Sequence, residues 1–314
     1  MNKLKRIHRG SFPHLRSLAA VAVLFAVPFA TPLLFAQVAE RRPQPAAPTL
    51  AALISALRAK SESLKSSPGT RGEYESFLSA HKQAPGTVSY SDFILLHLIF
   101  EAARDAGFWN LRWSITDQPP NSDRIWAQWK EVRKPSFAEK TATGECDELS
   151  ALFAFLAMRA GVKGVGLFWP YPNHTVAVWS VHPANGPTIR VVVPTSQIFL
   201  NENDTFDTRG FDPGHQKTIY DYARRDVPDS LELPKPLFDF FLAQLDKYGG
   251  LLTKTLQQLR NLREAVIQKS LTPAEAAHEA LRRTAAYSTT PDDRAAFRRF
   301  ADDLNASVNE CRSA

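Results

Sequence analysis

The chain has 314 residues, with 38 Lys and Arg against 32 Asp and Glu, which gives a formal net charge of +6. Five of the basic residues and no acidic residue lie in residues 1–36, so the rest of the chain has 33 basic (38 − 5) against 32 acidic residues. A nearly neutral chain lacks the basic surface on which nucleic-acid binding depends, so no nucleic-acid partner is expected. The length allows one sizeable domain with a helical addition.

The first 36 residues have the pattern of an export signal. A basic stretch is followed by an apolar run, Leu18–Phe29, and by the small residue Ala36, after which cleavage is expected. We therefore expect an exported protein, either periplasmic or extracellular. The alternative is an uncleaved anchor, because the apolar stretch Leu18–Ala36 spans 19 residues. In that case the protein would meet the membrane only through this segment.

Residues 37–48 are rich in proline and predict a linker after this leader. A domain over residues 49–230 and a helical region over residues 231–314 are expected to follow. Apolar residues at helical spacing, with capping and breaking residues between them, predict helices in both regions. These helices cover Thr49–Ser66, Gly72–His81, Ser91–Gly107, Ser122–Arg133, Phe238–Tyr248, Leu252–Lys269, Pro273–Tyr287 and Pro291–Asn309. Pro68 and Gly69 are expected to break the chain between the first two helices.

Three short segments in the middle of the chain are rich in β-branched and aromatic residues. They cover Gly164–Trp169, His174–Val181 and Thr188–Val193, with turn residues between them. Such segments predict three antiparallel strands. With helices on both sides of these strands in the sequence, the pattern indicates an α+β fold.

Cys146 lies at the start of a strongly apolar helix that precedes these strands. Thr143 or Gly144 can cap the helix, acidic residues fill its first turn, and Gly161 suits the left-handed position at its end. Backbone N–H groups and the helix dipole stabilise a thiolate at such a position. Because His174 follows on a predicted strand, the pattern predicts a Cys–His pair for nucleophilic catalysis.

Other interpretations of these residues remain open. Cys146 could be a buried structural residue, or it could form a disulfide with Cys311. Cys146, His174 and His182 could together offer three metal ligands, although no known metal-binding spacing supports this. Residues 201–212 alternate oxygen side chains like a calcium loop but lack its central glycine. No metal and no other cofactor is therefore expected.

The order of these motifs resembles the transglutaminase-like branch of the papain-like cysteine enzymes, over about residues 140–200. The similar segments are Gly144–Leu152, Arg159–Val162, Val165–Phe168, His174–Val178 and Val192–Thr195. The resemblance implies a transglutaminase-like core, in which the Cys-bearing helix packs on a small antiparallel sheet flanked by N- and C-terminal helices. It also implies that Cys146 is the nucleophile and His174 the base.

In that family an Asp directly before a Pro-Thr pair orients the histidine. Val193 occupies this position here, and a valine cannot orient an imidazole. Thr195 and Gln197 follow on the same segment and are the preferred replacements, because an orienting group need not be a carboxylate. The acids of the next loop are further candidates: Asp204, Asp207 and Asp212.

The resemblance implies acyl transfer, in which the thiol attacks an amide and water or an amine resolves the thioester. Together with the export signal, it implies a peptidase or amidase that acts on peptides or proteins of the cell envelope. The rival interpretation is a catalytically impaired domain of the same fold that binds a partner in the envelope. The loss of the Asp at Val193 favours this rival.

Overall fold

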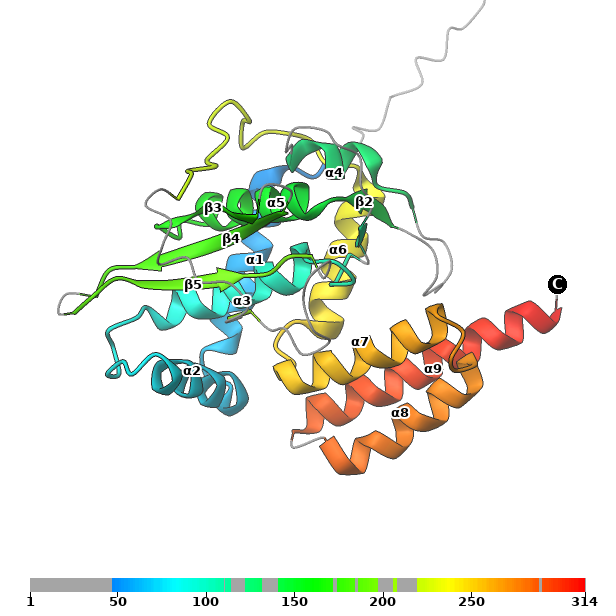
Figure 1. The fold of residues 1–314 in the computed structure, drawn as a ribbon. Helices are drawn as coiled ribbons and strands as arrows, with labels where there is room; N and C mark the ends of the chain where they lie inside the picture. The colour runs from blue at the N-terminus through cyan, green and yellow to red at the C-terminus, as the bar shows by residue number, and fades with distance from the viewer. Residues whose placement is uncertain are drawn as a thin grey trace, which may run out of the picture. The chain divides into compact units, whose positions relative to one another are not determined.

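The computed structural model describes residues 47–109, 111–113, 122–131, 141–171, 174–183, 186–196, 206–207, 219–287 and 290–313 (Figure 1). All of them belong to one unit of packed structure, Ala46–Ala314. The predicted leader and most of the predicted linker lie outside the described residues. The unit has the α+β composition that the sequence predicts, with helices before and after a small antiparallel sheet.

Three helices precede the sheet, namely α1 (Leu50–Leu64), α2 (Pro68–Ala80) and α3 (Tyr90–Ala103). Each begins after a side chain that accepts a hydrogen bond from its first turn, and these caps are Thr49, Ser67 and Ser89. The prediction that Pro68 breaks the chain is wrong. Pro68 is instead the first residue of α2, where proline loses no helical hydrogen bond and its fixed φ suits the helix.

The sheet contains β3 (Val165–Tyr171), β4 (His174–Val181) and β5 (Ile189–Val193) in that order, with both pairs antiparallel. The three predicted strands are thereby confirmed. One face of the sheet, with Ala177 and Val193, belongs to the main core. The other face, with Val176 and Val192, forms a small second cluster. Side chains therefore alternate between the two faces along β4 and β5.

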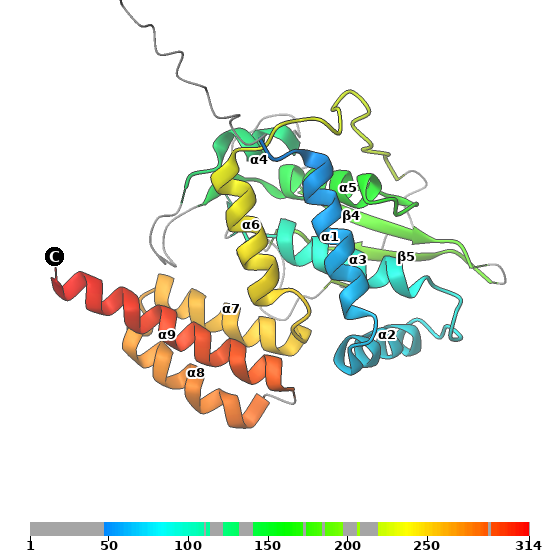
Figure 2. The same cartoon turned by 180° about the vertical axis from the view of Figure 1, so that it is seen from behind.

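Helix α5 (Cys146–Arg159) packs against β3 and β4, α3 packs on α5, and α1 packs on α3 (Figures 1 and 2). Elements on several sides therefore cover α5, which is why its sequence is apolar around most of its circumference. Leu149, Leu152 and Phe155 are fully buried. The helix is followed by Gly161 at φ +93°, the left-handed conformation that the sequence predicts.

Two short strands were not predicted. β1 (Leu111–Trp113) and β2 (Ala142–Gly144) form a parallel pair, and β2 leads directly into α5. Strands this short carry too little periodicity to be recognised in a sequence. The nearby helix α4 (Ser122–Gln128) is shorter than predicted, and Trp126 packs on Trp109 in the core with 5.1 Å between the ring centroids.

Four helices end the chain: α6 (Lys235–Tyr248), α7 (Thr253–Ile267), α8 (Pro273–Tyr287) and α9 (Pro291–Ser313). Phe241 of α6 is fully buried against Trp109, with 5.2 Å between the ring centroids. Helices α7, α8 and α9 pack on one another (Figure 2). Thr253 ties α7 to the N-terminal helices, because its backbone N–H donates to Glu73 at 2.6 Å and its hydroxyl bonds to His97 at 3.1 Å. The predicted boundary at residue 230 thus lies inside one packed unit. None of the described helices is both long and apolar enough to cross a bilayer.

Candidate active site

Cys146 lies at the N-terminus of α5, as predicted, and is the first residue of the helix. Glu145 is the N-cap residue, and its backbone N–H donates to the Glu148 carboxylate at 2.7 Å. The predicted caps, Thr143 and Gly144, instead end strand β2. The helix therefore begins one or two residues later than a Ser/Thr/Gly preference suggests, because the glutamate pair closes its first turn.

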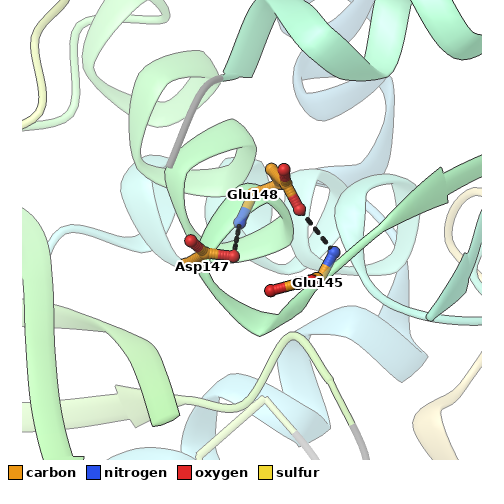
Figure 3. A group of neighbouring side chains, drawn as sticks. All are labelled: Glu145, Asp147 and Glu148. Atoms are coloured by element: carbon orange, nitrogen blue, oxygen red, sulfur yellow. Dashed lines mark hydrogen bonds between the residues drawn. The ribbon is translucent and has the colours of Figure 1, made fainter. Parts of the chain in front are cut away.

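Three carboxylates lie together at this helix start (Figure 3). Glu145, Asp147 and Glu148 have carboxylate oxygens within 4.8 Å of one another. Glu148 is buried and accepts from Arg124 at 2.5 Å as well as from the Glu145 N–H. Burial, and then the charges of Glu148 and Glu145, raise the pKa of Asp147 to about 6. Both carboxylate oxygens of Glu148 already accept hydrogen bonds, one from Arg124 and one from the Glu145 N–H, so Glu148 acts as a cap of the helix.

The thiol of Cys146 is buried, with 7 % of the residue exposed. Burial raises its pKa, a backbone hydrogen bond from Thr175 lowers it, and the neighbouring Asp147 and Glu145 raise it again. The net shift is upward, so the resting sulfur is a thiol at neutral pH. Desolvation and the adjacent acids therefore outweigh the stabilisation of a thiolate that the helix N-terminus alone predicts.

His174 is the first residue of β4 and is 1 % exposed. Burial lowers its pKa to about 4, because an imidazolium is costly to desolvate. Its neighbour in the chain is Thr175, whose backbone lies close enough to the Cys146 sulfur to lower the pKa of the thiol. The start of α5 therefore lies close to the start of β4, but Cys146 and His174 form no hydrogen bond with each other, and both are neutral at pH 7.

A buried polar link joins α5 to the sheet one turn beyond Cys146. The Ser150 hydroxyl donates to the Thr175 carbonyl at 3.1 Å and lies 2.7 Å from the Thr195 hydroxyl. All three residues are buried. The link connects the first turns of the helix to β4 and to the residues that follow β5, so it holds α5 in one position on the sheet.

The structure places some of the candidate orienting residues. Thr195 is bonded to Ser150, and its role towards His174 stays a prediction. Asp207 bonds to His81 at 2.5 Å. The remaining candidates lie outside the described residues: Gln197, Asp204 and Asp212.

The register of the sheet points to a residue that the sequence analysis missed. Val193 lies opposite Ala177 and is fully buried in the main core, so the position expected to carry an orienting Asp does not face the imidazole. The strand ends at Val193, and Ser196 would lie opposite His174 only if the same register continued for three more residues. Ser196 is 1 % exposed, and its hydroxyl has no hydrogen-bond partner among the described residues.

The structure bears on two other roles of Cys146, as half of a disulfide and as a metal ligand. Cys146 carries a free thiol, so the alternative disulfide with Cys311 is not formed. His182 directly follows the last residue of β4, and the eight residues of this extended strand span about 26 Å at 3.3 Å per residue. One metal ion therefore cannot take both His174 and His182, and the three-ligand set that included them is wrong.

Comparison of the chain with protein-family models, with curated proteins and with solved structures returns no significant match. The class of protein established here is an α+β protein with a three-stranded antiparallel sheet. The feature of this fold that bears on function is the closeness of the start of α5, with Cys146, to the start of β4, with His174.

Proposed function

We propose that this protein is an exported thiol enzyme with a transglutaminase-like core. Cys146 and His174 would carry out acyl transfer on amides of extracytoplasmic peptides or proteins. The observation that carries the proposal is the closeness of Cys146, the first residue of a helix, to the backbone of Thr175, the residue next to His174. The packing of α5 on the antiparallel sheet supports the core, and the leader sequence supports the location.

Because both groups rest in their neutral forms, His174 acts as a general base during the attack. The thiol proton of Cys146 moves to the imidazole while the sulfur bonds to the amide carbonyl carbon. The backbone N–H of Cys146 at the helix start can donate to the oxyanion. The C–N bond then breaks, and the imidazolium gives its proton to the leaving amine. Water or a second amine attacks the thioester and frees the sulfur.

We assign the orientation of His174 to Ser196. Its buried hydroxyl follows β5 by three residues and bonds to no described residue, His174 included, so it is available to turn towards the imidazole. A hydroxyl that accepts from one ring nitrogen leaves the other nitrogen free to take the thiol proton. Thr195 already shares its hydroxyl with Ser150, and Gln197 is the remaining alternative.

The test is acylation of Cys146 by a small activated ester, p-nitrophenyl acetate, in a Cys311→Ser background. We expect one equivalent of p-nitrophenolate to be released and the acetyl group to be found on Cys146 by mass spectrometry. His174→Ala should slow the acylation about 10²-fold or more, because it removes the general base. His182→Ala is the matched control, since it removes an imidazole at the other end of the same strand, and it should leave the rate unchanged.

Total thiol, counted in urea, shows that Cys146 is intact in every variant. If His174→Ala acylates as fast as its parent, the two residues are not a catalytic pair and the proposal is rejected.

The burial of the pair favours a second candidate function, a non-catalytic binding domain of the same fold. Alternation along β4 assigns His174 to the face of Val176, whereas α5 packs on the opposite face. In this case Cys146 is a structural core residue. Equal and slow acylation of the parent and His174→Ala is the outcome that supports it.

A further inference from the structure

A cavity separate from Cys146 lies between α2, α3 and the start of α7. Its volume is about 710 Å³, which is within the range of small-molecule sites. Helix α2 contributes one face rich in small residues, so the helix backbone itself forms part of the wall. The residues of α2 that line it include Gly69, Gly72, Ser76 and Ala80.

Aromatic rings form the opposite wall. His97 stacks on Phe93 at 5.9 Å between centroids with 8° between the ring planes. Phe206 meets both rings edge-on, at 6.0 Å from Phe93 and 5.7 Å from His97. Phe77 extends the wall at 5.1 Å from Phe93. The three phenylalanines are 3–7 % exposed and His97 is half-buried, so an apolar body would meet the edges of these rings.

Two carboxylates line the cavity, those of Glu73 and Asp207. Glu73 accepts from the Thr253 backbone at 2.6 Å through one oxygen, and Asp207 bonds to His81 at 2.5 Å through one oxygen. Among the described residues that line the cavity, Lys254 is the one lysine or arginine, and it is exposed. The chemistry of the lining is thus aromatic and acidic.

The N-terminus of α7, which lines the cavity, does not make the cavity attractive to anions. A helix N-terminus attracts anions, but here the protein's own acids occupy it. Glu73 takes the Thr253 N–H, and Asp293 takes the Leu252 N–H at 3.3 Å. An anionic ligand would have to enter beside these carboxylates, whereas a cation would gain from them.

We propose that this cavity is a binding site for a small organic cation, an amine that carries an apolar or aromatic body. The ammonium group would lie between Glu73 and Asp207, where carboxylate oxygens accept charge-assisted hydrogen bonds. The body would lie against the edges of Phe93 and Phe206 and against the half-buried ring of His97. The site needs no chemistry at Cys146 and is independent of the function proposed above.

A larger side chain at position 72 can fill the cavity without disturbing the fold. A Cβ added at Gly72 would meet nothing within 4 Å, and the residue lies in the interior of α2. Gly72→Leu should therefore fill the space and also raise the stability of the helix, because leucine favours helices more than glycine does. The thermal midpoint shows whether the variant is folded.

The experiment is calorimetric titration of the full chain with three probes of one shape: 2-phenylethylamine, 2-phenylethanol and 3-phenylpropionate. We expect the amine to bind about tenfold more tightly than the alcohol, the gain of one charged hydrogen bond, and the carboxylate to bind least. Gly72→Leu should abolish binding while remaining folded. Glu73→Gln keeps an acceptor for the Thr253 N–H and should remove the advantage of the amine.

Glu75→Gln is the matched control, because Glu75 lies on the exposed side of the same helix and should bind the amine like the wild type. Cys146→Ser should also bind normally, which keeps this result apart from any result on catalysis. Equal binding of amine and alcohol, tighter binding of the carboxylate, or full binding by a folded Gly72→Leu would each overturn the proposal.

Discussion

At the residue scale, the chemistry of the junction depends on what burial does to each group. Burial lowers the pKa of His174 to about 4 and raises that of the Cys146 thiol, so neither carries charge at pH 7. Asp147 shifts the opposite way to His174, since burial and its acidic neighbours raise its pKa to about 6. The helix N-terminus alone would favour a thiolate at Cys146, but the sulfur is a neutral thiol. The neighbouring Asp147 loses stabilisation when it ionises.

This cost predicts the effect of Asp147→Asn. An Asp with a folded-state pKa above its unfolded value gives up stability as pH rises through the interval from 3.8 to about 6. We expect the asparagine variant to gain about 1–2 kcal/mol in free energy of unfolding at pH 7.5, after allowance for solvent screening, and nothing below pH 4. The variant should also lower the pKa of Cys146. Urea denaturation at the two pH values measures the first effect, and alkylation rate against pH measures the second.

The control is Asp302→Asn on the exposed side of α9, which should change neither quantity. A stability gain that is the same at both pH values would show that charge repulsion at the helix start is not the cause.

At the element scale, the contact between α5 and the sheet combines apolar packing with one polar link. Leu152 and Phe155 are fully buried, and so is Ser150, whose hydroxyl bonds to Thr175 and Thr195. A buried hydroxyl left without a partner destabilises the fold. The link therefore specifies one rotation and one height of α5 relative to β4, where apolar side chains alone would allow several.

A double-mutant cycle measures this link. Ser150→Ala and Thr195→Val should each lower the free energy of unfolding by about 1–2 kcal/mol, because each leaves a buried hydroxyl or carbonyl without its partner. In the double variant the losses should be less than additive by about 0.5–1.5 kcal/mol. Ser55→Ala on α1, which removes an exposed hydroxyl bonded to its own helix, is the control and should cost little. Additive losses would mean that the two hydroxyls do not interact in solution.

At the scale of the whole molecule, the C-terminal helices complete the core of the region before them. Phe241 of α6 packs against Trp109, and Arg263 of α7 donates to the Ala106 carbonyl at 3.0 Å. Helices α6–α9, which the sequence analysis assigns to a separate region, thus share one core with the sheet domain, the region of residues 49–230 that contains β3–β5. Unfolding of one part should expose the apolar surface of the other.

Phe241→Ala tests this coupling. The change removes a fully buried ring and should lower the free energy of unfolding by about 3–5 kcal/mol. Because the parts share one core, we expect tryptophan fluorescence, which reports mainly on the sheet domain, and helical circular dichroism to lose their signals at the same urea concentration. Leu281→Ala on α8 is the control, since this side chain is 47 % exposed. Two separate transitions, with only the helical one shifted, would contradict a shared core.

The sequence by itself determined the elements whose signals are local. The end of α5 before Gly161 and the first residue of β4 at His174 follow from glycine conformation and β-branched composition, and the apolar run places the start of α5 to within two residues of Cys146. These signals act within a few residues, so they can be read without knowing the fold. The same reasoning failed at Pro68, where a residue that breaks helices can also begin one.

Only the tertiary structure decided the state and the neighbours of the site. Burial, which raises the pKa of Cys146 and lowers that of His174, depends on elements far away in the sequence. The register of β4 and β5, which sets Val193 opposite Ala177 and turns it into the core, depends on the pairing of two strands. Desolvation and strand register are both properties of contacts between distant segments, so no local pattern in the chain encodes them.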